Sequence, residues 1–150
     1  MSMYFIGIDI SKYKHDCCII SAANQKVVSK VIIKNNKAGF NELLTIIHSL
    51  ANPADIRIGF ESTAHYALNL ELFLENSLLT FMEVNPVLIS EYKKSKTLRR
   101  TKTDSVDCES IARWLMTVEY KPHSKGFYHA YSLKSLTRLR DRLVRQRSFY

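Results

Sequence analysis

The sequence predicts an α/β protein in which a mixed five-stranded sheet carries helices on both faces. Two observations support this fold class. Residues 4–10, YFIGIDI, are apolar on both alternating faces apart from Asp9, which is typical of a central strand covered on both sides. Three consecutive predicted strands are then followed by helix, strand, helix and strand, an order that joins a meander to parallel crossovers.

Each element has a local signal. Strands are predicted at short apolar runs bounded by turn residues, namely Tyr4–Ile10, Asp16–Ala22, Lys26–Ile33, Ile56–Glu61 and Leu78–Val84. Helices are predicted where apolar residues recur every three or four positions: from Asn35-Asn36 to Asn52-Pro53, at His65–Asn76, Val87–Tyr92 and Thr103–Val118, and from Ser132 onward. The last helix reaches Tyr150 without a stop signal, so we expect the natural protein to continue beyond it.

Length and cysteine content narrow the class of protein. A chain of 150 residues is one domain of ordinary size. No apolar run approaches the length of a membrane span, and the N-terminus lacks the order of a signal peptide. The three cysteines, Cys17, Cys18 and Cys108, have no metal-ligand spacing, which indicates reduced, packed thiols. We therefore expect a cytoplasmic protein without a zinc site.

Positive charge is concentrated in the second part of the chain. Residues 1–92 hold 7 basic and 9 acidic residues, whereas residues 93–150 hold 15 basic and 5 acidic residues. This asymmetry favours a polyanionic partner, with nucleic acid ahead of acidic lipid, although a solvated basic surface gives the same count. The residues predicted to contact nucleic acid lie in the basic loop 93–102 and the last helix: Lys93, Lys94, Lys96, Arg99, Arg100, Lys102, Arg138, Arg142 and Arg145.

The last helix has a second interpretation. Its leucines Leu133, Leu136, Leu139 and Leu143 form an apolar seam, which is typical of a core or coiled-coil contact. This seam predicts a homo-oligomer formed through the C-terminal helix.

Two acids end two predicted strands in the same way. Gly7-x-Asp9 closes the first strand and Gly59-x-Glu61 closes the fourth. If these strands are parallel neighbours, both carboxylates lie at their carboxyl ends, where open α/β sheets bind ligands. The glycines would leave room for a backbone or an ion. In the alternative, Glu61 is the solvated end of an edge strand.

A second acidic pair lies at the start of the helix predicted at 103–118. Asp104 and Asp107 are three residues apart, so within a helix they share a face, and that face continues into the apolar stripe of Cys108, Ile111 and Leu115. The acids would then point towards the sheet. The alternative is helix capping, with Asp104 at the N-cap and Asp107 three residues later.

Four converging carboxylates repel one another and ionise together only around a strong positive charge. Oxygen ligands suit Mg²⁺ or Mn²⁺. Two such ions would grip a phosphodiester, activate water or a hydroxyl group, and stabilise the leaving oxygen. The residues thus predict a two-metal site made by Asp9, Glu61, Asp104 and Asp107.

The segments GIDIS-K, ESTAHY, VNP and RRTKTDSVDCESIA together resemble the N-terminal domain of the DEDD transposases. These are the insertion-sequence enzymes of the one-ten family, related to the Piv invertase, and their domain is ribonuclease H-like (RuvC-like). The resemblance spans residues 4–118, with Lys102–Ala112 as its most specific part; Ala64 and Cys108 stand where the family often has glycine and alanine. It implies that Asp9, Glu61, Asp104 and Asp107 are the catalytic tetrad.

The resemblance also implies metal-dependent phosphodiester cleavage and strand transfer on DNA during transposition. Some members use an element-encoded guide RNA. Residues 1–118 would form the catalytic domain, and residues 119–150 a linker and the start of a truncated basic helix. The family's further domain, with a nucleophilic serine, would lie beyond Tyr150.

Three alternatives remain open at this point. One is a RuvC-like structure-specific endonuclease, and another is a nucleic-acid-binding domain without catalysis. The third is a sugar kinase or actin-like ATPase, whose first strand carries a phosphate-binding D-x-G-x-[ST] pattern. GIDISKY lacks the glycine after Asp9, which disfavours this third class.

Overall fold

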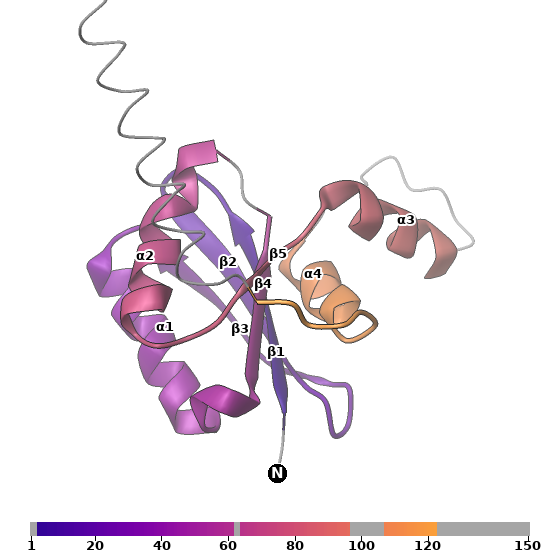
Figure 1. The fold of residues 1–150 in the computed structure, drawn as a ribbon, viewed down its shortest axis with the longest axis horizontal. Helices are drawn as coiled ribbons and strands as arrows, with labels where there is room; N and C mark the ends of the chain where they lie inside the picture. The colour runs from indigo at the N-terminus through magenta and orange to yellow at the C-terminus, as the bar shows by residue number, and fades with distance from the viewer. Residues whose placement is uncertain (1–2, 62–63, 97–106, 123–150) are drawn as a thin grey trace, which may run out of the picture.

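A computed structural model of the chain describes residues 3–61, 64–96 and 107–122. Its strands are β1 (Tyr4–Ile10), β2 (Lys14–Ser21), β3 (Val27–Lys34), β4 (Ile56–Phe60) and β5 (Met82–Glu83). They form one sheet in the order β3-β2-β1-β4-β5 (Figure 1). The pairs β1–β2 and β2–β3 are antiparallel, whereas β1–β4 and β4–β5 are parallel. The predicted mixed five-stranded sheet is therefore confirmed, with β1 as its central strand.

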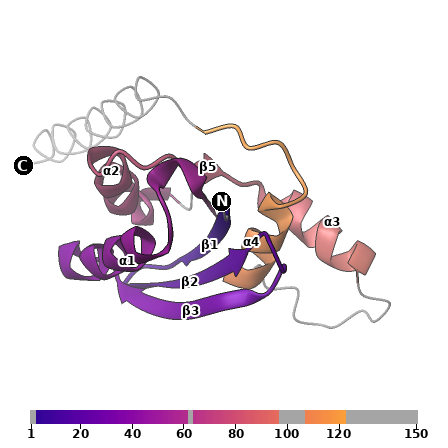
Figure 2. The ribbon, with the colours of Figure 1, turned by 90° about the horizontal axis from the view of Figure 1, so that it is seen from below.

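The described residues form four α-helices: α1 (Lys37–Leu50), α2 (Leu68–Asn76), α3 (Pro86–Lys96) and α4 (Cys108–Leu115). Helix α4 packs on the sheet, and α3 packs against α4 on its outer side (Figure 2). Short 3₁₀ helices occupy Pro53–Asp55 and Ala64–Tyr66. Helices α1 and α2 lie on one face of the sheet, and α3 and α4 lie on the other (Figures 1 and 2). The prediction of helices on both faces is confirmed.

The larger core lies between the sheet and helices α1 and α2. Ile6 and Ile8 of β1 are fully buried there with Leu43 and Ile47 of α1. Helix α1 begins where the sequence predicts, because the Asn36 side chain accepts a 2.9 Å hydrogen bond from the Gly39 N–H. This core fixes the direction of β1 and therefore the place where its carboxyl end emerges.

A second core lies between the sheet and helix α4. Phe5 of β1 packs there with Ile111, Trp114 and Leu115 of α4. Helix α4 runs very close to β1, since a Cβ atom on Gly7 would overlap Cys108 O and lie 2.5 Å from Ala112 N. The expectation that this glycine leaves room for a backbone is confirmed, and the backbone is that of α4.

The structure corrects the predicted boundaries of β5 and α3. The strand predicted at Leu78–Val84 shrinks to β5, because Leu78 lies in a turn with a positive φ of 60° and ladder pairing with β4 begins only at Met82. The loop predicted from Lys93 begins later, since α3 continues through Lys96. Asn85-Pro86 starts this helix: Asn85 Oδ1 accepts a 2.9 Å bond from the Val87 N–H, and proline suits the first helical position.

The helices of residues 3–61, 64–96 and 107–122 include none that is long and apolar enough to cross a membrane. The helix predicted from Ser132 onward lies outside the described residues.

Candidate functional site

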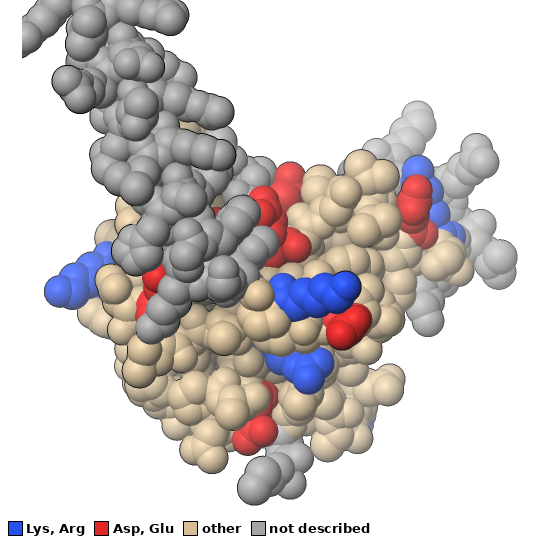
Figure 3. All heavy atoms as spheres, viewed as in Figure 1, with Lys and Arg blue, Asp and Glu red and all other residues tan. Residues whose placement is uncertain are grey.

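The carboxyl ends of β1 and β4 bring two of the predicted acids together. The strands pair in parallel with Gly7 opposite Gly59 and Ile8 opposite Phe60. Asp9 follows Ile8 and Glu61 follows Phe60, so the two acids lie side by side at the carboxyl ends of these neighbouring strands. Both are half-buried. In the orientation of Figure 1, β1 runs upward from the N-terminus, and Figure 3 shows acidic side chains gathered near the top of the same view.

Asp9 is the centre of this acidic group. Burial raises the pKa of its carboxyl group, and the negative charges of Asp16, Asp107 and Glu61 raise it further, in that order. A raised pKa means that the ionised carboxylate is disfavoured here, because it loses solvent and gains like-charged neighbours. The three other acids come from three different segments of the chain. The fold therefore concentrates negative charge around one side chain.

Asp16 is a member of this group that the sequence analysis missed. It lies directly opposite Asp9 in the antiparallel β1–β2 ladder. Directly opposed side chains share a face of the sheet, and like charges in such a pair are unfavourable. The signal was present, because a hairpin that joins the first two predicted strands over a short turn sets Asp9 against Asp16. Pairing the predicted strands would have found it.

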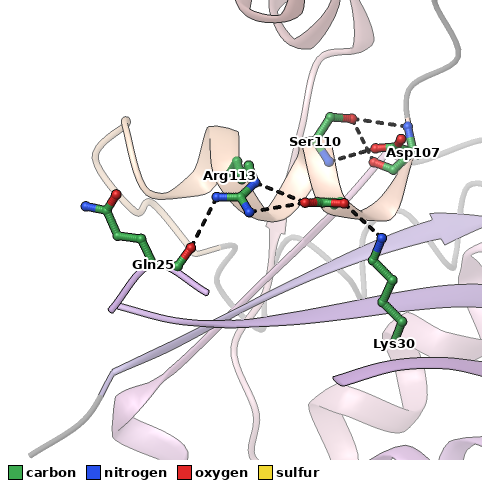
Figure 4. Close-up of polar contacts among 6 residues, drawn as sticks. Gln25, Lys30, Asp107, Ser110 and Arg113 are labelled. Carbon is green, nitrogen blue, oxygen red and sulfur yellow. Dashed lines mark hydrogen bonds and ion pairs between the residues drawn. The ribbon is translucent and has the colours of Figure 1, made fainter. Parts of the chain in front are cut away.

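Asp107 enters the site from the N-terminus of α4. Its backbone is extended, and its Oδ1 accepts a 2.8 Å hydrogen bond from the Ser110 N–H, while the Ser110 Oγ accepts a 3.1 Å bond from the Asp107 N–H (Figure 4). This reciprocal arrangement is a capping box. The prediction that Asp107 lies inside a helix was wrong, since α4 begins at Cys108 and ends at Leu115. Asp104 lies outside the described residues.

Helix α4 is held in register by a polar chain along its exposed side. Glu109 binds Lys30 of β3 at 2.8 Å and Arg113 at 3.1 Å, and Arg113 donates a 3.3 Å bond to the Gln25 carbonyl (Figure 4). Partly exposed ion pairs contribute little stability, so burial of Ile111 and Leu115 anchors the helix. The polar contacts of Glu109 and Arg113 favour one rotation of α4 about its axis. In this orientation Asp107 lies near the carboxyl ends of the strands.

Of the three nearby thiols, Cys17 and Cys18 are disfavoured as metal ligands, whereas the hydrogen bond with Cys18 lowers the pKa of Cys108. Cys18 of β2 and Cys108 of α4 are buried and hydrogen-bond to each other. That bond and burial raise the pKa of Cys18, and burial raises the pKa of Cys17 to about 12. Thiols bind metals as thiolates, so protonated Cys17 and Cys18 serve packing. The expectation of reduced, packed cysteines is met by three free, buried thiols.

The donor chemistry of the acidic group fits a hard divalent cation. Asp9, Asp16, Glu61 and Asp107 offer only carboxylate oxygens, which Mg²⁺ and Mn²⁺ prefer. Within residues 3–61, 64–96 and 107–122, no three His, Cys, Asp or Glu side chains are close enough to form a metal shell. The described acids therefore interact electrostatically, but they do not form a complete metal-coordination shell.

Three of the basic residues predicted to contact nucleic acid lie on α3. Lys94 is exposed and Lys93 half-buried, on the same side of the sheet as α4. Lys96 ends that helix. The remaining members lie outside the described part of the chain: Arg99, Arg100, Lys102, Arg138, Arg142 and Arg145.

Known proteins are similar to this chain in sequence and in fold. A family model described as a transposase, of the DEDD type, matches residues 6–149. Pilin gene-inverting proteins of Moraxella bovis and Moraxella lacunata are each 33% identical over 115 residues, which is 76% of this chain and 34% of theirs. The chain therefore spans about a third of the length of these curated relatives.

A solved structure shares the fold at low sequence identity. The structure of T. thermophilus RuvC in complex with a Holliday junction substrate has a TM-score of 0.52 and 10% identity, covering 81% of this chain and 99% of the RuvC chain. The predicted ribonuclease H-like (RuvC-like) fold is therefore confirmed. Since the transposase model spans nearly the whole sequence, from residue 6 to residue 149, the chain belongs to the DEDD transposase family.

Proposed function

We propose that this chain is the N-terminal catalytic domain of a DNA transposase or recombinase, which carries out metal-dependent phosphodiester cleavage and strand transfer. The observation that supports it most is the convergence of Asp16, Glu61 and Asp107 on Asp9, whose pKa they raise. This convergence lies at the carboxyl ends of parallel strands, the usual ligand-binding edge of an α/β sheet. Family membership supplies the reaction class, and it argues against the kinase alternative.

Asp9, Glu61, Asp104 and Asp107 are the proposed metal ligands and catalytic acids. When bound, two Mg²⁺ or Mn²⁺ ions would activate the attacking hydroxyl or water and stabilise the leaving oxygen. Asp9 sits centrally, between Asp16 on β2 and Glu61 after β4. Asp107 Oδ1 accepts a hydrogen bond from the Ser110 N–H, so Oδ2 is the oxygen that would bind the ion. This division keeps the start of α4 intact while Asp107 takes part in the site.

The proposed division of the chain is a catalytic domain over residues 1–118 and a linker with a basic helix over residues 119–150. The proposed partner is DNA, held by the basic residues around 93–102 and 138–145. Guide-RNA use and homo-oligomer formation through the C-terminal helix belong to the same proposal, as does a cytoplasmic location with the DNA. DNA binding rests on charge and the homo-oligomer on the leucine seam of residues 133–143, whereas guide-RNA use follows from the family resemblance and the cytoplasmic location from the cysteine content.

A second candidate function is structure-specific DNA cleavage without strand transfer. It is favoured by one observation: the matched RuvC chain, solved with a Holliday junction, is covered over 99% of its length. The two candidates share the acidic site and differ in product. A nicked junction alone supports the endonuclease, whereas a joined product supports the transposase.

Metal dependence of thermal unfolding tests the site directly. A ligand that binds only the folded state stabilises it, so Mn²⁺ should raise the melting temperature of the wild type. Asp9→Asn should abolish this rise while leaving the metal-free protein at least as stable, because it removes a charge that the fold disfavours.

The matched control is Asp55→Asn. Asp55 lies before β4, at the opposite end of the sheet from Asp9 and Glu61. Its substitution should leave the response to Mn²⁺ unchanged. Equal responses of the wild type and Asp9→Asn would place any metal site elsewhere and would remove the basis of the proposed function.

A further inference from the structure

Two lysines face each other at the end of the β2–β3 ladder. Lys14 and Lys34 are directly opposite partners in the antiparallel pairing, and both are exposed. Like charges placed opposite each other destabilise a sheet. Among the residues that the structure describes, neither lysine forms an ion pair. The arrangement is unfavourable in the free protein and would be relieved by an anion between the two ammonium groups.

The lysine pair lies on the same face of the sheet as the acidic group. Side chains alternate along a strand, so Lys14, Asp16 and Cys18 share one face of β2. Cys18 packs against Cys108 of α4, which identifies this face as the one covered by α4. Asp16 is opposite Asp9, so the acids and the lysines are neighbours on one surface. Two residues along a strand span about 7 Å, the axial rise of about two nucleotides in one DNA strand.

The turn beside the lysine pair is held in a fixed shape. The Asn35 N–H donates to the Tyr13 carbonyl at 2.9 Å, and the Asn35 Nδ2 donates to the Lys12 carbonyl at 3.0 Å. The Ser11 hydroxyl also donates to the Lys14 carbonyl. The turn of residues 11–13 is therefore already ordered in the free protein. Less conformational entropy is lost when it binds a partner.

That turn presents a cation and an aromatic ring together. The Tyr13 side chain is 75% exposed, and Lys12 Nζ lies 5.1 Å from the centre of its ring. Basic and aromatic side chains side by side are typical of surfaces that follow a nucleic-acid strand. The first 92 residues are net acidic, so this basic group is distinct from the excess charge that follows them.

We propose that Lys14 and Lys34, with Lys12 and Tyr13 at the adjacent turn, bind the phosphodiester backbone of the nucleic-acid strand that enters the acidic site. Counting the spacing of about 4.8 Å between neighbouring strands, the phosphate at Lys14 lies about two nucleotides from the one held near Asp9, and the phosphate at Lys34 about three to four. This inference rests on the proposed function for the direction of the strand. The strand then crosses the exposed ends of β1, β2 and β3, in addition to the basic residues after position 92.

Salt-dependent DNA binding tests the proposal. Fluorescence anisotropy of a labelled duplex of arbitrary sequence is measured against the 150-residue protein over a range of salt concentrations. Each lost phosphate contact should make the log–log slope shallower by about 0.9 and, at 0.1 M salt, weaken binding about eight-fold. Lys14→Gln and Lys34→Gln should each show this effect, and the double variant should show about twice the change in slope.

Lys26→Gln is the matched control. Lys26 is an exposed lysine in the turn at the opposite end of β2, so the substitution changes charge equally and should leave the slope unchanged. All four lysine variants should keep the wild-type far-UV circular dichroism spectrum, because their side chains are exposed. A Lys14 or Lys34 variant that behaves like the control would overturn the proposal. Equal competition by poly-L-glutamate would also overturn it, since the pair would then recognise charge and not a nucleic-acid backbone.

The same proteins separate this inference from the proposed function. If Mn²⁺ stabilises the wild type but not Asp9→Asn, while Lys14→Gln and Lys34→Gln bind DNA like the wild type, the catalytic proposal stands. The proposed DNA contact by the two lysines is then overturned. DNA binding that depends on these lysines, without a response to Mn²⁺, supports the lysine contact and overturns the catalytic proposal. A wild-type protein without salt-dependent binding would overturn the lysine contact outright.

Discussion

Replacing Gly7 with alanine tests the close approach on which the geometry of the site depends. The added Cβ atom would overlap Cys108 O and lie 2.5 Å from Ala112 N and 3.0 Å from Ile111 Cβ. Two of these three neighbours are backbone atoms of α4. Ordinary contact begins near 3.4 Å, so the helix must move by about 0.9 Å to clear Ala112 N alone.

The expected cost follows from what that movement breaks. Overpacking a well-packed core typically costs about 1–3 kcal/mol. Gly7→Ala belongs at the upper end, at about 3 kcal/mol, because a buried helix has to shift and not a side-chain tip. For a domain of this size, each kcal/mol lowers the melting temperature by about 2–4 °C, so we expect a loss of about 6–12 °C.

Gly59→Ala is the matched control. Its Cβ atom would meet the Leu115 side chain, with both Cδ atoms at 2.7 Å, and a leucine can change rotamer. We expect a cost of about 1 kcal/mol, or about 2–4 °C. Neither glycine has a positive φ, so the comparison isolates packing from backbone strain.

Thermal unfolding followed by circular dichroism measures the stability change, and tryptophan emission reports its cause. Trp114 is the single tryptophan of the chain and is 7% exposed on α4. Gly7→Ala should shift its emission to longer wavelength in the folded protein, whereas Gly59→Ala should not. A Gly7→Ala variant with the wild-type melting temperature and emission, or a Gly59→Ala variant that is the less stable of the two, would refute the reasoning.

Three further predictions concern charge. Glu71 is 6% exposed, and burial, with the charge of Glu83 second, raises its pKa to about 7. The folded state thus holds this proton more tightly than the unfolded chain, so stability falls as pH rises from about 4.5 to about 7. Glu71→Gln should raise the free energy of unfolding by up to about 3 kcal/mol at pH 8, measured as a higher melting temperature, and should change nothing near pH 4. Asp107→Ala should lower stability by about 1 kcal/mol through loss of the cap in urea titrations, whereas Asp107→Asn keeps the cap and should stay near wild type. Asp16→Asn should lower the pKa of Asp9, measured by ¹³C NMR titration of its carboxyl group; an unchanged Asp9 titration would show that the opposed pair does not interact.

Alternating apolar patterns predicted the sheet because its central strand is buried on both faces. Ile6 and Ile8 face α1 and α2, while Phe5 and Gly7 face α4, so both faces leave a signal in the sequence. The shared Gly-x-acid ending of two strands then predicted which carboxylates would meet, because parallel strands end at one edge.

The strand predicted at Leu78–Val84 was too long because apolar spacing reports burial and not hydrogen bonding, and the other errors have causes of their own. Leu79 and Phe81 are buried as a strand would be, yet the chain there is not paired until Met82. Asp107 has the spacing of a helical residue but acts as the cap, because a capping side chain and a helical one leave similar patterns. Asp16 was missed because its role depends on strand register and not on its local sequence.

The capping box also makes the Ser110 backbone amide a reporter on the acidic group. The Ser110 N–H donates its hydrogen bond to Asp107 Oδ1, so we expect its exchange with solvent to become faster when that bond opens. Any ion, ligand or neighbouring charge that draws this carboxylate away from the helix opens that bond before it unfolds the protein. The hydrogen-exchange rate of the Ser110 amide therefore reports whether the Asp107 carboxylate is bound to the helix or drawn towards the acidic group, without an attached probe.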